Sequence, residues 1–183
     1  MSTKEQIIEL ADVLIRAKGY NAFSFYDISE KVGIKTASIH YHFPSKSDLG
    51  VAVIEKSILN LEKVAKTYED KSPVEKLERF FTIYSDILNE KEICIVGSLS
   101  TDFNTLDEKV QEKLKVFSGE MIRWVSSFLE EGRNQKIFAF EDEPRTRALL
   151  LITNMISIVQ LSRLTGKEDF AILKDSIKKQ LIR

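Results

Sequence analysis

The sequence predicts an all-α protein. No segment shows the sustained alternation of apolar and polar residues that a half-buried strand requires. The chain has only three prolines, and Pro44, Pro73 and Pro144 each fall where a helical pattern begins. We therefore expect nine helices, and we find neither an internal repeat nor a low-complexity segment between them.

The first helix is expected over residues 3–18. Ser2 and Glu5 have the spacing of a capping box, in which each side chain satisfies a free backbone amide at the start of a helix. Gly19 then follows as a residue that readily takes the backbone conformation that ends a helix. One face of this helix carries an apolar stripe, formed by Ile7, Leu10, Ala11, Leu14 and Ile15.

Two short helices are expected next, joined by a tight turn. The first begins at Ser24, with Asp27 in the capping position three residues later, and ends at Gly33. The second covers about residues 35–43. This arrangement is typical of a helix-turn-helix. The apolar residues expected in its core are Ile28, Val32, Ile39, Phe43 and Leu49.

A long fourth helix is expected from Ser45, where Asp48 completes another cap, to about residue 68. Further helices are expected at about 73–90, 98–104, 107–132, 144–164 and 168–181. We expect two domains: a three-helix domain over residues 1–46, which contains the helix-turn-helix, and a larger helical domain over residues 47–183. The fourth helix should bridge them without a flexible linker.

Composition restricts the class of protein. The chain has 183 residues and a net charge of −1, so nucleic-acid binding requires a local basic patch. Cys94 is the only cysteine, which excludes an intrachain disulfide and suits a reducing cytoplasm. The N-terminus lacks the apolar core of a signal peptide. The apolar stretch 149–164 contains several polar residues, and we interpret it as a buried helix and not as a membrane span.

Such a basic patch lies in the second helix of the expected helix-turn-helix, the one that normally enters the major groove. Residues 31–47 contain no acidic side chain but include three lysines. Hydroxyl and imidazole groups accompany them, and Ala37 would let the helix lie close to a surface. Composition alone would equally fit a solvated helix with incidental polar residues, so the order of the residues must decide.

That order resembles a known family. The stretch GYNAFSFYDISEKVGIKTASIHYHFPSKSDL, residues 19–49, is similar to the N-terminal signature of the TetR/AcrR regulators, and with the first helix the resemblance covers about 55 residues. His40 departs from the pattern, because a tyrosine is common there; we expect an altered base preference and retained DNA binding. The resemblance implies binding to double-stranded operator DNA. It assigns DNA contacts to Ser24, Lys35, Thr36, Ser38, His40, Tyr41, His42 and Lys46, of which Ser24 and Lys46 would contact phosphate.

The rest of the chain resembles the family in the number and length of its helices only. The resemblance implies a small-molecule pocket among the fourth to eighth helices and a homodimer interface at about 144–164 and 168–181. Alternatively, the helix at 144–164 is buried within one subunit. Aromatic and polarisable residues are the pocket candidates, although each could simply be core: Phe81, Tyr84, Phe103, Phe117, Met121, Trp124, Phe128 and Met155.

Cys94 is a further candidate in this pocket. The stretch EICIVGSLSTDFNTLDEKVQEKL resembles a branch of the family that includes the repressor of N-ethylmaleimide reductase, a sensor of reactive electrophiles. Reactivity would require a nearby cation or helix N-terminus. The alternative is an inert thiol that fills space between Ile93 and Ile95.

An enzyme is the rival class, and the sequence argues against it. The only histidines, His40 and His42, lie two apart on a helix and point in different directions, so they cannot share a metal. No HExxH, GxSxG or P-loop pattern occurs. We expect no catalytic residue, metal or cofactor. The sequence therefore predicts a transcriptional regulator. The family's default is a repressor, which a small molecule or an electrophile would release from its operator. The alternatives are an activator and a protein that binds another protein in place of DNA.

Overall fold

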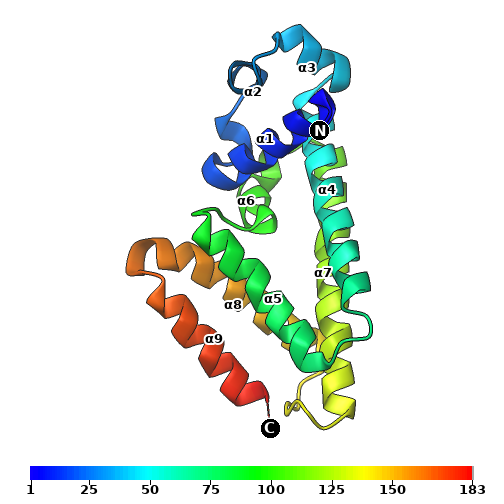
Figure 1. Ribbon diagram of the computed structural model, residues 1–183, viewed down its shortest axis with the longest axis vertical. Helices are drawn as coiled ribbons and strands as arrows, with labels where there is room; N and C mark the ends of the chain where they lie inside the picture. Colours follow the sequence, from blue (N-terminus) through cyan, green and yellow to red (C-terminus); the bar gives the residue numbers. More distant parts are fainter. Residues whose placement is uncertain (183) are drawn as a thin grey trace. The chain divides into compact units, whose positions relative to one another are not determined.

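The structure is a computed structural model, and it describes residues 1–182. Within these residues there is no β-strand, only an isolated bridge between Phe138 and Ile182. The all-α prediction is confirmed. The elements are α1 (Thr3–Lys18), η1 (Tyr20–Ala22), α2 (Phe25–Val32), α3 (Thr36–His42), α4 (Lys46–Thr67), α5 (Pro73–Asn89), α6 (Ile95–Thr101), η2 (Phe103–Thr105), α7 (Glu108–Asn134), α8 (Pro144–Thr165) and α9 (Glu168–Leu181) (Figure 1).

The helices begin where local signals predict. Glu5 accepts a hydrogen bond from the Ser2 amide at 2.7 Å, and the Ser2 hydroxyl accepts one from the Glu5 amide at 3.3 Å, which completes the capping box of α1. Ser72 and Glu75 form the same box at α5. Pro73 and Pro144 are the first residues of their helices, where the missing N–H costs nothing.

The chain divides into two compact units. The first contains residues 1–60 together with 95–118, and the second contains residues 61–94 together with the chain from Gly119 onward. Each unit is discontinuous in sequence, because α4 and α7 each contribute to both. The segment with α6, η2 and the start of α7 thus belongs to the unit that holds α1, α2 and α3.

The first unit is built around α1, which packs against α2, α3 and α6. Ile28, Ile39, Phe43 and Leu49 are buried as predicted. The prediction for Val32 was wrong, because this residue is only half-buried. As the last residue of α2, it lies at the edge of the core, where it borders a shallow surface groove.

Helix α6 begins and ends three residues earlier than we expected. Leu99 is fully buried, and the Ser98 hydroxyl donates a hydrogen bond to the Ile15 carbonyl of α1 at 2.7 Å. Beyond Thr101 the helix stops, and the Asp102 carboxylate accepts a hydrogen bond from the Tyr20 amide at 2.9 Å. These are contacts with residues more than 80 positions earlier in the chain, so local sequence could not place the boundary.

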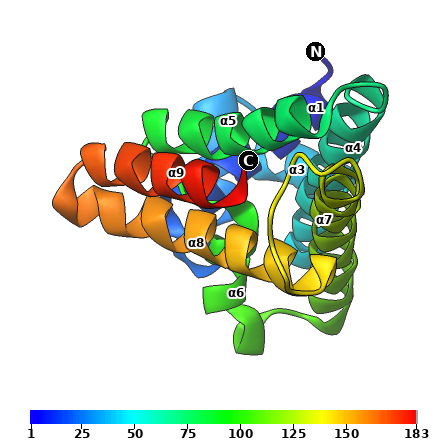
Figure 2. The same cartoon turned by 90° about the horizontal axis from the view of Figure 1, so that it is seen from below.

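The second unit is formed by α5, α8, α9 and the adjoining parts of α4 and α7. Helix α8 packs against both α5 and α9, and Figure 2 shows α8 and α9 side by side. The Lys76 ammonium of α5 pairs with the Glu131 carboxylate of α7 at 2.7 Å. The fully buried Phe138 ring lies against Gly132, where a Cβ atom would come within 2.2 Å of the ring, so only glycine fits there.

Candidate nucleic-acid interface and ligand cluster

The turn between α2 and α3 has the geometry of a helix-turn-helix. Gly33 ends α2 with φ 75° and ψ 30°, the left-handed conformation that glycine adopts without steric cost. The Gly33 and Ile34 amides both donate to the Ser29 carbonyl, at 2.9 and 3.1 Å. The chain then enters α3 after only two further residues, and this fixes the angle between the two helices.

Helix α3 is held by one face. Ile39 is fully buried and Phe43, just after the helix, is 3% exposed. The His40 ring packs edge-on against the Phe25 ring of α2, with 4.8 Å between centroids. These contacts anchor α3 to the unit and leave its opposite face uncovered.

The uncovered face carries the predicted DNA-contact residues. With about 100° between successive residues, Ala37 and Tyr41 lie opposite the buried Ile39 and Ser38 lies to one side of it, and all three are exposed. The Tyr41 side chain is 85% exposed, a large ring left in water. Lys35 and His40 are also exposed, whereas Thr36 and His42 lie at the half-buried flanks. The structure thus places six of the predicted DNA-contact residues on α3 or at its N-cap, namely Lys35, Thr36, Ser38, His40, Tyr41 and His42.

The two predicted phosphate contacts have partners within the protein. The exposed Ser24 donates both its amide and its hydroxyl to the Asp27 carboxylate, at 2.7 and 2.6 Å. The Lys46 ammonium donates to the Phe23 carbonyl and lies over the Phe23 and Tyr20 rings, 4.2 and 4.8 Å from their centroids. Burial lowers the pKa of Lys46, although the Asp102 and Asp27 carboxylates act in the opposite direction.

Lys46 therefore ties the start of α4 to the segment before α2. Its remaining N–H groups have donor capacity for a phosphate, because an ammonium has three donors, so the predicted phosphate contact stays a prediction. Sequence reasoning missed the anchoring role. The signal was the pair of aromatic residues, Tyr20 and Phe23, which had no assigned function.

A second lysine near α4 was also missed. The Lys109 ammonium of α7 lies 2.5 Å from the Asp48 carboxylate and 3.3 Å from the Ser45 hydroxyl at the start of α4. The hydrogen bond from Lys109, followed by the one that the Ser45 hydroxyl donates to the same carboxylate, lowers the pKa of Asp48. Lys109 is exposed and adds positive charge beside the first turn of α4. It is 61 residues from Asp48, so no local motif indicates the contact.

The ligand candidates divide between the two units. Phe103, which is half-buried, and Phe117, which is buried, belong to the first unit. The other candidates all belong to the second unit: Phe81, Tyr84, Cys94, Met121, Trp124, Phe128 and Met155. Except for the half-buried Trp124, the residues of this second set are buried.

Aromatic rings form the centre of the second set. The Phe80 ring lies 5.2 Å from Tyr84, 5.8 Å from Phe81, 6.4 Å from Phe128 and 6.5 Å from Trp124, measured between centroids. We call these five residues the aromatic cluster. Sequence reasoning missed Phe80, its central member. Such tilted and edge-on pairs stabilise a core beyond the area they bury.

Cys94 lies beside this cluster. It is 7% exposed and lies next to the Tyr84 hydroxyl. The same hydroxyl donates to the Met121 sulfur at 3.8 Å. Burial, followed by the neighbouring Cys94, raises the pKa of Tyr84 well above its ordinary value, so the phenol stays protonated.

Helix α8 has two different faces. Its buried residues include Ala148, Ile152 and Met155. The other face exposes large apolar side chains, and Ile172 of α9 is 66% exposed. By length and composition alone α8 would pass for a membrane span, with a mean hydropathy of 1.4 over 18 residues, a test that core and interface helices also pass. The exposed leucines of α8 are Leu149, Leu150, Leu161 and Leu164.

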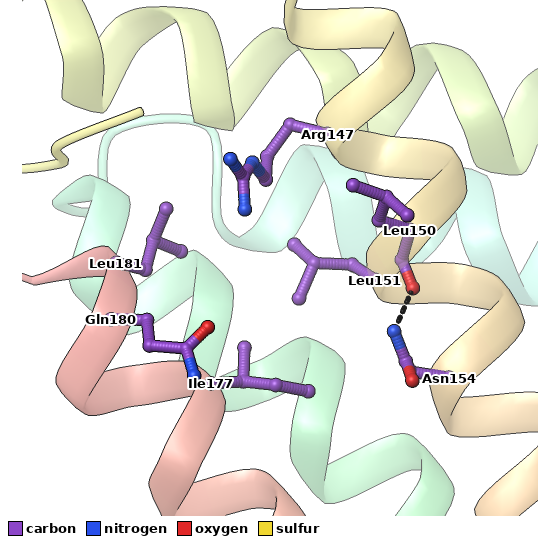
Figure 3. A pocket seen from close by; sticks show the side chains of 7 residues that line it. All are labelled: Arg147, Leu150, Leu151, Asn154, Ile177, Gln180 and Leu181. Carbon is purple, nitrogen blue, oxygen red and sulfur yellow. Dashed lines mark hydrogen bonds between the residues drawn. The ribbon is translucent and has the colours of Figure 1, made fainter. Parts of the chain in front are cut away.

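A groove of about 170 Å³ separates α8 from α9 at one end of this surface (Figure 3). Its walls are mostly apolar, with Leu150 and Leu151 on α8 and Ile177 on α9. Arg147 and Gln180 point into it in Figure 3. The Arg147 guanidinium pairs with the Asp142 carboxylate at 2.5 Å, so its charge is already compensated.

A short helix held by one buried face, displayed after a tight glycine turn, defines a helical DNA-binding regulator. Comparison with known proteins agrees with this class. The model of the family "Bacterial regulatory proteins, tetR family" matches residues 7–53. A TetR transcriptional regulator from Legionella pneumophila is 35% identical over the whole chain and 98% of its own length, with a TM-score of 0.90. The chain therefore belongs to the TetR family, whose members are transcriptional regulators and not enzymes.

More distant relatives fit the same family. The repressor DhaR of Mycobacterium sp. is 26% identical over 129 residues, which are 68% of this chain and 63% of DhaR, so the match spans less than two thirds of that protein. The reduced form of NemR from E. coli is 18% identical over 98% of this chain and 97% of NemR, with a TM-score of 0.82. At that identity the likeness shows a common fold and leaves the role of Cys94 to experiment.

Proposed function

We propose that this protein is a transcriptional repressor that binds operator DNA as a homodimer and leaves it when a small molecule binds. The observation that carries the proposal is the uncovered face of α3, where Ser38 and Tyr41 are exposed within a stretch free of acidic residues. The relative DhaR is named a transcriptional repressor, and this supports repression rather than activation.

The chemistry of α3 suits duplex DNA. A negatively charged backbone attracts Lys35 and Lys46 whatever the net charge of the molecule, and such contacts position a protein without reading sequence. Hydroxyl and imidazole groups on the same helix can bond with base edges in the major groove. A protein partner would bury the Tyr41 ring equally well, but it would not require a stretch of 17 residues (31–47) without one carboxylate.

The homodimer is supported by the exposed apolar surface of α8 and α9. Leu161 is 49% exposed and Leu164 is 86% exposed on the same helix. Large apolar side chains left exposed near both ends of α8 favour an interface with another chain. Asn154, Ser157 and Gln160 are exposed between the leucines and offer hydrogen bonds across a two-fold axis. A two-fold dimer presents two α3 helices to major grooves about one turn, roughly 34 Å, apart.

Ligand control is proposed to act through α4. This helix begins at Lys46, directly after the three residues Phe43-Pro44-Ser45 that follow α3, and continues into the second unit. A ligand that prefers one arrangement of the helices shifts the population toward it. Tilting α4 would change the spacing of the recognition helices and lower DNA affinity. Operator DNA must then weaken ligand binding by the same factor. We also propose a cytoplasmic location, since the DNA and a reduced thiol are found there.

The test is selection of bound sequences from fragmented DNA of the source genome, followed by gel-shift titration of the enriched duplex. We expect a partly palindromic sequence and a steep salt dependence. The double variant Ser38→Ala/Tyr41→Ala should lose the enrichment, whereas Lys63→Ala, exposed on α4 in the second unit, should keep it. If the double variant enriches the same sequence as the wild type, α3 is not the reading helix. If no DNA sequence is enriched and a protein is captured instead, the result would favour a protein partner in place of DNA.

The electrophile mechanism needs its own experiment, because Cys94 is buried and reactivity requires access. Wild type and Cys94→Ser are treated with N-ethylmaleimide, and release of the operator is measured. We expect both proteins to keep the operator, which favours a non-covalent ligand. Release from the wild type alone would establish covalent sensing, since an added group would overpack the region around Ile93 and Ile95.

A further inference from the structure

The Tyr84 hydroxyl is the most deeply buried polar group of the aromatic cluster, since Trp124 is only half-buried. Its residue is 2% exposed, so bulk water does not reach it. Its hydrogen bond is to a sulfur atom, the Met121 thioether at 3.8 Å, and the Cys94 thiol lies next to it. Sulfur is a weak hydrogen-bond acceptor. The strongest donor of this core is therefore only weakly satisfied.

The surroundings of this hydroxyl are apolar and uncharged. The other members of the cluster are Phe80, Phe81, Trp124 and Phe128, and none carries a charge. Lys76, one turn before Phe80 on α5, is paired with Glu131. An ionised group placed beside Tyr84 would thus be buried without a counter-ion, which is strongly unfavourable.

The side chain that a ligand would displace from the Tyr84 hydroxyl, that of Met121, is also a flexible one. Met121 is unbranched, and its three rotatable bonds let the thioether move without backbone change. Its departure would free the Tyr84 hydroxyl to donate to an oxygen acceptor, and this bond is stronger than one to sulfur. Phenylalanine rings would then cover the rest of the molecule, as in most small-molecule sites.

We infer that Tyr84 anchors the ligand of this protein, and that the ligand is a neutral, ring-sized apolar molecule whose single carbonyl or hydroxyl oxygen replaces the Met121 sulfur. This inference rests on the proposed ligand control and narrows it to one chemical class. It excludes carboxylates and quaternary amines as occupants of this site.

The test uses three probes of similar size: acetophenone, which has a carbonyl; cumene, which lacks one; and benzoate, which is charged. Trp124 is the only tryptophan of the chain, and its ring lies 5.4 Å from Phe128, so its fluorescence reports binding at the cluster. For the wild type we expect acetophenone to bind about tenfold more tightly than cumene, the value of one hydrogen bond. We expect no binding of benzoate in the same range.

Tyr84→Phe should reduce the affinity for acetophenone to that for cumene, because it removes only the donor. Met121→Leu keeps the volume and removes the competing sulfur, so the preference for acetophenone should persist or grow. Tyr68→Phe, outside the cluster, is the matched control and should behave as the wild type. Melting curves confirm that each variant is folded.

Three results would overturn the inference: equal binding of acetophenone and cumene to the wild type, a preference that survives in Tyr84→Phe, or binding of none of the probes. Gel shifts of the unliganded proteins distinguish a failure of this inference from a failure of the proposed function. If wild type and Tyr84→Phe both bind the operator while the probes fail, only the ligand class is wrong. If neither binds any operator, the proposed repressor itself fails.

Discussion

The uncovered face of α3 and the aromatic cluster are the two candidate binding regions, and they differ in how their chemistry is displayed. On α3, the residues that hold the helix and those that face outward are different residues: Ile39 is fully buried, while Tyr41 is 85% exposed. In the aromatic cluster, the residues that would bind a ligand are the same ones that hold the core together. Binding and stability are therefore separable in the first region and coupled in the second.

Truncating one ring in each region should give the largest contrast. Phe80→Ala removes the centre of the aromatic cluster and should lower the free energy of unfolding by about 3–5 kcal/mol. Tyr41→Ala should leave the free energy of unfolding within about 0.5 kcal/mol of the wild type, because the ring is exposed. Urea denaturation measures both. A large loss of stability in Tyr41→Ala would contradict the separation proposed for α3.

Within the first region, base reading and phosphate contact should also separate. Ser38→Ala should change the preference at defined base pairs by about 1–3 kcal/mol. Lys46→Ala should weaken binding to all sequences and reduce the salt slope by about 1. Gel shifts with a set of single-base-pair variants, at several salt concentrations, distinguish the two. A changed base preference in Lys46→Ala would reverse our assignment of roles.

Two glycines of α7 test how tightly the second unit is packed. At Gly132 a Cβ atom would meet the Phe138 ring at 2.2 Å, whereas at Gly119 nothing lies within 4 Å. Gly132→Ala should therefore cost about 1–3 kcal/mol through overpacking. Gly119→Ala should stabilise the helix by about 0.5–1 kcal/mol. Opposite shifts of the melting temperature are expected. A rise of the melting temperature in both variants would mean that the Phe138 ring moves aside freely.

The smallest effect should come from a feature that both units contain, the capping carboxylate at the start of a helix. Hydrogen bonds from Ser24 lower the pKa of Asp27 at α2, and hydrogen bonds from Ser72 lower the pKa of Glu75 at α5. The unfolded chain then binds the proton more tightly, so this contribution is present above the ordinary carboxyl pKa and is lost as the pH falls through the folded value. Melting temperatures should decline less steeply in acid for Asp27→Asn and Glu75→Gln. Unchanged acid sensitivity in both variants would show that the caps contribute nothing.

Local signals in the sequence predicted much of this fold. The Ser-x-x-acid boxes at Ser2, Ser24 and Ser45 and the prolines at 73 and 144 act on the few residues that follow them, so they place helix starts without tertiary information. The shift of α6 had the opposite cause: Ser98 and Asp102 bond with Ile15 and Tyr20.

The candidate sites follow the same rule. The exposure of Ser38 and Tyr41 follows from helical spacing once Ile39 is taken as buried. Their contact with DNA is implied by the family resemblance and stays a prediction. The anchoring of Lys46 by Tyr20 and Phe23 was not predictable, since it depends on a fold-back across 23 residues. The predicted ligand residues included Phe103 and Phe117 of the first unit together with residues of the second unit. In the sequence, an aromatic residue on an apolar helix face has the same appearance in either unit.

The contacts of α6 and η2 with the connector at Gly19–Phe23 also affect how such a protein can be cut or recombined. Asn21 donates to the Thr105 hydroxyl at 2.7 Å, Tyr20 to Asp102 and Ser98 to Ile15. A fragment that ends after α3 would lose each of these bonds and expose the side of α1 on which Leu99 packs. The DNA-reading part is therefore not a portable module. Grafting its specificity onto another regulator would require the α6 segment to travel with it, or the exchange to be confined to the exposed positions of α3.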